Sequence, residues 1–247
     1  MPPDIYEQIN TKGKRFRGIR LRRYYAETSI LIITIPTLLH ERLHAEIYRA
    51  YEHKLARLGF QDSWAIIAST TLRRLGHPRG DGGEADSAGG PRPERSGNGG
   101  WPTLVIEAGD SESINRLRQD MNWWFDASNH QVKIVLLTKF HHGKKELCLE
   151  KWEETWETRP GPTLTRSTEA AADASQRVLT PTKKQDITIT RDSSKSPPDY
   201  IVTRGALELE FSLLFNRASR ADRGEVDFVW SADEMKVYAA HVWEAVQ

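Results

Sequence analysis

The chain has 247 residues, of which 38% are hydrophobic and 28% are charged, and its formal net charge at pH 7 is +1. This length can bury one good core, and the near-zero charge excludes a general attraction to nucleic acid, so any such contact needs a local basic patch. The single cysteine, Cys148, excludes an internal disulfide, and the longest apolar run is too short to cross a membrane. We expect an intracellular protein of the cytoplasm or the nucleus without a membrane partner.

The N-terminal segment predicts a β-hairpin followed by a helix. Two β-rich runs, 17–25 and 29–36, flank a short polar break and are typical of a hairpin. We interpret their many basic residues as a solvated face, with a nuclear-import signal or a phosphate contact as the alternatives. Apolar residues then recur at helical spacing from Leu38 to Leu58. His40 and His44 share a face of this helix and could bind a metal, but we interpret them as surface histidines.

The most informative segment begins at Trp101 and contains a predicted strand over 103–107. Its apolar run suits a strand buried on both faces, and Glu107 stands where this strand leaves the core. Asp110 or Ser111 can cap the helix that follows, and 132–138 is a second apolar strand. A right-handed crossover makes the two strands parallel and puts Glu107 at their carboxyl edge, where open α/β sheets place their sites. Because a buried carboxylate needs a metal, a cation or backbone donors, Glu107 is the strongest functional candidate.

Other residues of chemical interest have simpler interpretations. Trp123 and Trp124 could stack on bases, but adjacent helical residues point about 100° apart, so we expect core packing. His141, His142 and Cys148 are soft-metal ligand types, yet a fourth ligand at zinc-site spacing is missing from the sequence pattern. We interpret this segment as a hairpin turn.

Two stretches lack the apolar density of a core. Residues 76–100 are rich in glycine and predict a flexible loop, without the ending of a phosphate-binding loop, and 159–198 predict a linker. Ordered elements resume in 199–247, where a capping box at Ser231 opens a final helix. We therefore expect a core domain over 1–158 and a C-terminal segment that docks on it.

Several motifs of the chain resemble a known family. Trp-Pro-Thr-Leu-Val-Ile-Glu-Ala-Gly at 101–109, the later Trp-Trp and Val-Lys-Ile-Val, Pro36-Thr37 with His40-Glu41, and Asp86-Ser87 are similar to fungal proteins of unassigned role within the restriction-endonuclease-like superfamily, the PD-(D/E)XK nucleases. The resemblance covers about residues 17–155. It implies an α/β fold, a mixed sheet flanked by helices, here with a C-terminal appendage. In active relatives it also implies Mg²⁺-dependent cleavage of DNA phosphodiesters.

The resemblance further implies which residues form the site. Glu107 matches the second metal-binding carboxylate and Asp86 the first, with Asp81 as its substitute. A carboxylate-held Mg²⁺ would stabilise charge on the phosphoryl oxygens and supply hydroxide near neutral pH. DNA is accordingly the expected partner.

One element of the family pattern is missing. The catalytic lysine would stand at position 109, where this chain has Gly109, and we consider Arg118 and Lys133 as relocated cations. Two functions therefore remain. The first is a Mg²⁺-dependent endonuclease, and the second is a degenerate, noncatalytic nuclease-fold protein that serves as an interaction or nucleic-acid-binding module. The missing lysine favours the second, whereas Glu107 favours the first.

Overall fold

The computed structural model describes residues 20–67, 70–77, 79–97, 99–158 and 177–246. The first residues of the predicted hairpin and residues 159–176 of the predicted linker lie outside the described residues. Among the helices within those ranges, none is long and apolar enough to span a membrane.

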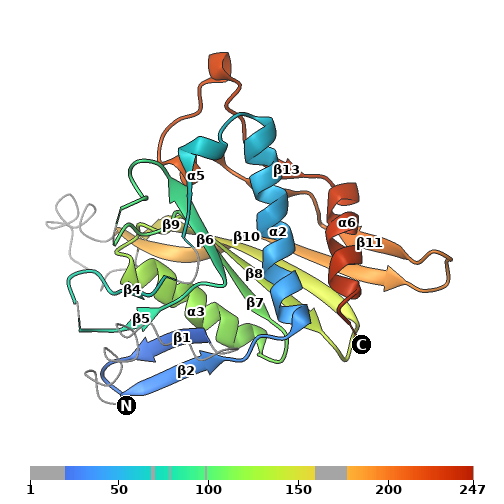
Figure 1. The fold of residues 1–247 in the computed structure, drawn as a ribbon, viewed down its shortest axis with the longest axis horizontal. Coiled ribbons are helices and arrows are strands. Elements are labelled where there is room, and N and C mark those ends of the chain that lie inside the picture. Colours follow the sequence, from blue (N-terminus) through green and yellow to red (C-terminus); the bar gives the residue numbers. More distant parts are fainter. Residues whose placement is uncertain (1–19, 68–69, 78, 98, 159–176, 247) are drawn as a thin grey trace, which may run out of the picture.

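A seven-stranded mixed sheet forms the centre of the molecule, and helices flank it (Figure 1). Its strand order is β11-β10-β9-β8-β7-β6-β3. The strands are β3 (Trp64–Ile66), β6 (Ser87–Pro91), β7 (Leu104–Gly109), β8 (Ile134–His141), β9 (Glu146–Thr158), β10 (Arg177–Asp192) and β11 (Asp199–Thr203). Strands β7 and β8 run parallel, as predicted, whereas the other neighbours pair antiparallel.

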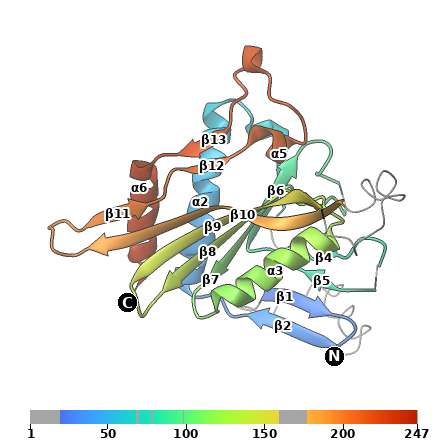
Figure 2. The same ribbon diagram turned by 180° about the vertical axis from the view of Figure 1, so that it is seen from behind.

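Helices α2 and α3 cover opposite faces of this sheet (Figures 1 and 2). The side chains of β7 alternate between them: Leu104 and Ile106 join the core cluster of α2, whereas Val105 joins that of α3. Burial on both faces explains the unbroken apolar run of this strand. The helices are α2 (Leu38–Arg57), α3 (Ile114–Ala127), α5 (Phe211–Phe215) and α6 (Ala232–Trp243), with short 3₁₀ turns at Gln61–Ser63 and Ala221–Arg223.

The predicted N-terminal hairpin is confirmed, and it belongs to a second, smaller sheet beside α3 (Figure 2). The order of this sheet is β2-β1-β5-β4. Its strands are β1 (Arg20–Tyr25), β2 (Ile30–Thr34), β4 (Leu72–Arg73) and β5 (Gly82–Gly83). Strand β1 turns Arg22 and Arg23 inward, where both side chains are buried. The interpretation of the whole basic hairpin as a solvated face is therefore wrong for these two residues.

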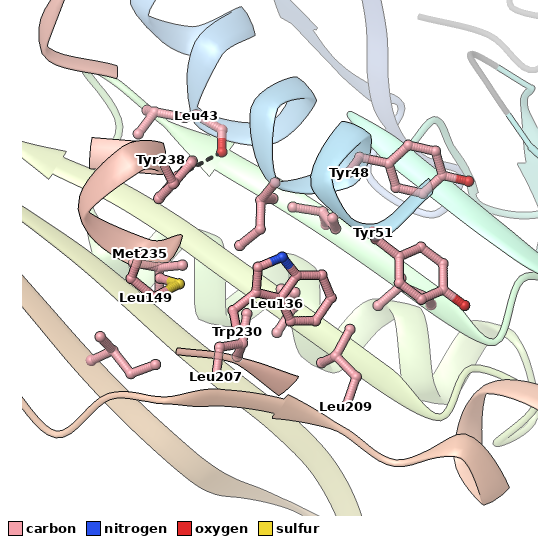
Figure 3. Packing of buried hydrophobic residues seen from close by; sticks show 14 of the residues in the cluster. Leu43, Tyr48, Tyr51, Leu136, Leu149, Leu207, Leu209, Trp230, Met235 and Tyr238 are labelled. Carbon is pink, nitrogen blue, oxygen red and sulfur yellow. Dashed lines mark hydrogen bonds between the residues drawn. The ribbon is translucent and has the colours of Figure 1, made fainter. Parts of the chain in front are cut away.

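The C-terminal segment completes the core on the α2 side of the sheet. Strands β12 (Leu207–Leu209) and β13 (Phe228–Trp230) form a two-stranded sheet, and α6 follows the predicted capping box. Figure 3 shows Trp230 and Met235 packed among side chains of α2 and the central sheet. Tyr238 of α6 donates its hydroxyl to the backbone carbonyl of Leu43 over 2.8 Å.

The glycine-rich stretch 76–100, predicted to be a flexible loop, instead contains β5 and β6. Its glycines allow close packing: a Cβ on Gly89 would lie 2.4 Å from the Trp64 indole nitrogen and 2.5 Å from the Tyr48 hydroxyl. Composition alone does not distinguish a glycine that makes the backbone flexible from a glycine that lets a neighbouring side chain pack against the backbone.

Two further expectations need correction. Within the predicted linker 159–198, residues 177–192 form β10, which pairs with β9 along its length. Its threonines and isoleucines favour a strand, but the charged residues between them hide the apolar pattern. Helix α3 is capped by Ser113, whose side chain accepts from the Arg116 backbone N–H, and not by Asp110 or Ser111.

Candidate functional site

The two acids expected from the sequence, Asp86 and Glu107, come from neighbouring strands. Strand β6 pairs antiparallel with β7 so that Ser87 lies opposite Ile106, and Asp86, directly before β6, therefore comes opposite Glu107. The backbone N–H of Ala108 donates to the Asp86 carboxylate over 2.8 Å. This bond ties the acid that precedes β6 to the strand that carries the other acid.

Glu107 lies inside the sheet rather than at its edge, because β7 continues to Gly109. Its side chain is fully buried, and the Trp124 indole N–H donates to its carboxylate over 2.5 Å. Guanidinium nitrogens of Arg22 and Arg23 lie 3.5 and 3.8 Å from its oxygens. The expectation that Glu107 stands where the strand leaves the core is thus wrong.

A third buried acid, Asp120 of α3, belongs to the same charge cluster. Its carboxylate pairs with Arg22 over 3.0 Å and with Arg23 over 3.2 Å. The Arg23 guanidinium also stacks on the ring of Trp123, 3.7 Å from its centroid. Sequence reasoning missed Asp120, although it lies three residues before the Trp-Trp pair on the face that carries Leu117 and Met121.

The surroundings of these acids shift their protonation in opposite directions. Burial, together with the neighbouring Asp86 and Asp120 carboxylates, raises the pKa of Glu107 to about 8, although Arg22 and Arg23 oppose the rise. Burial would also raise the pKa of Asp86, but His40, His44 and Arg22 lower it well below its ordinary value. The pair therefore contains one firmly ionised acid and one that titrates near neutral pH.

The cations proposed from the sequence lie elsewhere. Arg118 of α3 pairs with Glu150 of β9 over 2.5 Å. Lys133 precedes β8 and donates its ammonium to the backbone carbonyl of His130. Asp81, the substitute acid, accepts from the Ala26 backbone N–H at the hairpin. Among the hydrogen bonds and ion pairs of the described residues, none joins these three side chains to Glu107 or Asp86.

A different lysine, Lys139, lies beside position 109, where the family pattern has its catalytic lysine. Lys139 of β8 pairs in register with Gly109, and a Cβ on Gly109 would lie 3.1 Å from the Lys139 Cδ and 2.7 Å from the Leu117 Cδ1. The Lys139 ammonium donates to the backbone carbonyls of Asp110 and Phe140, and burial lowers its pKa. Since β7 and β8 were expected to be parallel, their register was the signal that could have identified this residue.

His40 and His44 are buried, so their interpretation as surface histidines is wrong. The two residues are 5% and 3% exposed, and they face Asp86 from the N-terminal half of α2. Together with Glu41, they also follow the spacing His-Glu-x-x-His, which is typical of zinc-protease helices. The sequence interpretation overlooked this match.

The segment interpreted as a hairpin turn joins β8 to β9, and His141, Glu146 and Cys148 bring possible metal ligands to within 4.8 Å of one another there. All three residues are partly exposed. Burial and the nearby Glu146 carboxylate raise the pKa of the Cys148 thiol to about 12, so the thiolate that a metal needs is disfavoured.

No protein-family model matches this chain, and no curated protein matches it either. Among solved structures, the chain is similar to the crystal structure of a "putative nuclease belonging to DUF820" from Anabaena variabilis, with a TM-score of 0.43 and 11% sequence identity. The similarity covers 72% of this chain and 94% of that chain. At this level, the similarity assigns neither an activity nor site residues.

Proposed function

We propose that this protein is a nuclease-like hydrolase that cleaves DNA phosphodiesters with the help of Mg²⁺. The observation that carries the proposal is the register of β6 and β7, which brings Asp86 next to Glu107, because metal-dependent phosphodiester cleavage needs carboxylate oxygens close to one ion. The ion, when bound, would stabilise charge on the phosphoryl oxygens and lower the pKa of a water.

The carboxylates of the pair already have cationic partners, which a metal ion would have to replace. The buried carboxylates of Glu107 and Asp120 contact the buried guanidinium groups of Arg22 and Arg23. The Asp86 carboxylate contacts Arg20 over 3.4 Å and His40 over 3.3 Å. A divalent cation would replace these cationic partners as the counter-charge of the carboxylates. To coordinate the ion, the Glu107 carboxylate would have to give up its contact with Arg22.

Lys139 takes the place of the missing family lysine in this proposal. Its aliphatic chain fills the space next to Gly109, and its ammonium is held by backbone carbonyls rather than by a carboxylate. A lysine with a lowered pKa can stabilise developing negative charge or orient a water. It can also lose its proton, whereas an arginine stays protonated.

The noncatalytic alternative is favoured by one observation of its own. The oxygens of Glu107 already have the Trp124 indole and two guanidinium groups as partners, and this is how proteins hold a buried structural carboxylate. In that case the charge cluster would fix the packing of α3 and β1 on the sheet, and the domain would act by binding.

A cleavage assay on supercoiled and linear DNA separates the two functions. The full chain is incubated with Mg²⁺, and Asp86→Asn, Glu107→Gln and Lys139→Met are compared with Asp62→Asn, which removes an exposed acid. The proposal requires cleavage by the wild type and by the control, and its loss in the three site variants. Absence of cleavage by a folded wild type, with DNA binding detected by fluorescence anisotropy, would support the alternative.

A further inference from the structure

Helix α2 presents a second set of polar side chains to the sheet, on the opposite face from Glu107. The hydroxyl of Thr37 caps the helix by accepting from the His40 backbone N–H, and His44 follows one turn later. The two imidazole rings lie 5.5 Å apart between their centroids, in an edge-on arrangement. A helix is the element that fixes this spacing, because residues four apart lie above one another.

The two rings converge on Asp86. One ligand atom from each of His40, His44 and Asp86 lies within 4.8 Å of those of the other two. The Nε2 atom of His40 is 3.3 Å from a carboxylate oxygen of Asp86. Modest side-chain movement would bring these atoms to the spacing of ligands around one ion, since zinc holds nitrogen and oxygen ligands at about 2.0–2.2 Å.

Three of the four ring nitrogens lack the well-formed hydrogen bonds that buried polar atoms normally have. Both nitrogens of His40 and the Nε2 atom of His44 are buried and make no hydrogen bond of good geometry among the described residues. Their nearest acceptors are carboxylate oxygens of Asp86 and Glu41, at 3.3 to 3.6 Å. Buried unsatisfied polar atoms are rare in native proteins and need an explanation. An ion bound between the rings would provide one.

Neighbouring groups would hold the ligands in place. The Ser87 hydroxyl lies 2.9 Å from Nδ1 of His44, which leaves Nε2 for coordination, and the Ala108 N–H orients the Asp86 carboxylate. Histidine ligands usually use their second ring nitrogen for such a contact. Glu41, half-exposed and paired with Arg20, lies 3.4 Å from Nε2 of His44.

We propose that His40, His44 and Asp86 form a zinc site, with Glu41 beside its open coordination position. Two imidazoles and one carboxylate are ligands that suit Zn²⁺, whereas Mg²⁺ prefers oxygen ligands alone. Three protein ligands leave a fourth position for water, as in catalytic zinc sites. The site shares Asp86 with the proposed Mg²⁺ site, but it does not rest on DNA cleavage, because the arrangement of its three ligands is observed without it.

The competing explanation is a direct ion pair between His40 and Asp86. Burial lowers the pKa of His40, but Asp86 and Glu41 raise it overall, so a protonated ring is the competitor of the ion. A proton and a metal cannot occupy the same ring nitrogen. Zinc binding should therefore release protons and weaken at acidic pH, which a permanent ion pair would not show.

Calorimetric titration of the full chain with Zn²⁺, after dialysis against a chelator, tests the site. We expect one ion per chain, at least about tenfold weaker in His40→Gln and His44→Gln, and unchanged in His53→Gln, which alters an exposed histidine of the same helix. Ser87→Ala removes no ligand and is expected to weaken binding less than the loss of either histidine.

Two further measurements keep the result decisive. Cys148→Ala removes a ligand from the other possible metal cluster, His141, Glu146 and Cys148, and should leave zinc binding intact. Loss of binding in this variant would overturn the proposal. Co²⁺ absorption of the wild type reports coordination of the metal by the protein without any substitution, in case the histidine variants do not fold. Absence of both zinc heat and a cobalt spectrum in the wild type would also overturn it. Zinc binding without DNA cleavage by Mg²⁺ would refute the proposed function alone.

Discussion

Trp124 donates its indole N–H to the carboxylate of Glu107 over 2.5 Å, and this bond links α3 to the middle of β7. The Trp124 ring packs edge-on against the rings of Trp101 and Trp123, at centroid distances of 5.9 and 5.0 Å. Such packing restricts the orientation of the ring and of its N–H. The protonation of Glu107 is therefore coupled to the packing of α3 on the sheet.

The first prediction concerns the pH dependence of stability. The pKa of Glu107 is about 8 in the folded chain and 4.5 for an ordinary glutamate. Its contribution to the free energy of unfolding is therefore full below pH 4.5 and is lost as the pH rises towards 8. Glu107→Gln, which keeps a neutral side chain, should lose less stability over this range. Urea unfolding between pH 5 and 8, with a chelator present, measures the difference, which has an upper bound of about 1.4 kcal/mol per pH unit. Parallel curves for wild type and variant would contradict the assignment, and Glu27→Gln, at an exposed position, is the control.

The second prediction concerns the buried arginine of β1. Arg23→Ala leaves Asp120 without its 3.2 Å partner and Trp123 without the stacked guanidinium, and it should lower the free energy of unfolding by about 3–5 kcal/mol. The matched control is Arg49→Ala, at a half-exposed arginine that pairs with Glu46 and should cost at most about 1 kcal/mol. Equal costs in chemical denaturation would show that the buried cluster contributes no more than a surface ion pair.

The third prediction concerns the glycines of β6. Gly89→Ala would place a methyl group against Trp64 and Tyr48, and we expect a loss of about 1–3 kcal/mol from overpacking. Gly97→Ala lies in the same glycine-rich stretch with no atom within 4 Å of its added Cβ and should change stability by less than about 0.5 kcal/mol. Thermal unfolding of both variants checks this. A small loss of stability at both positions would instead support the interpretation of residues 76–100 as a flexible loop.

The fourth prediction concerns the reactivity of the chain's single cysteine. Burial and Glu146 raise the pKa of Cys148 to about 12, so the folded protein should react with a thiol reagent at pH 8 much more slowly than the urea-unfolded chain. Glu146→Gln removes the nearby charge and should speed the reaction, whereas Glu157→Gln, an exposed position of the same strand, should not. An unchanged rate in Glu146→Gln would show that burial alone protects the thiol.

The elements set by local pattern were predictable from the sequence. The parallel pair β7 and β8, the helix between them and the capping box at Ser231 all follow from hydrophobic spacing and end signals. Strand β6 was not, because the role of Gly89 depends on Trp64 and Tyr48, which approach it from elsewhere in the chain.

The candidate site was predictable only in part. Asp86 and Glu107 could be chosen from the motif, but the cation beside Gly109 comes from the adjacent strand, which local spacing in the sequence does not reveal. The burial of the histidines was within reach, since His40, Leu43, His44 and Ile47 follow the apolar stripe of their helix. Their meeting with Asp86 depends on tertiary packing.

The bond between Tyr238 and Leu43 joins residues 195 positions apart, and the core around α2 is closed by β12, β13 and α6. During synthesis, α2 emerges long before the segment that covers it, and contacts of such separation form slowly because the intervening chain must first be ordered. The apolar side of α2 would stay open until residues 207–243 leave the ribosome. Shortening the chain before this segment should therefore yield an aggregation-prone product rather than a smaller stable domain.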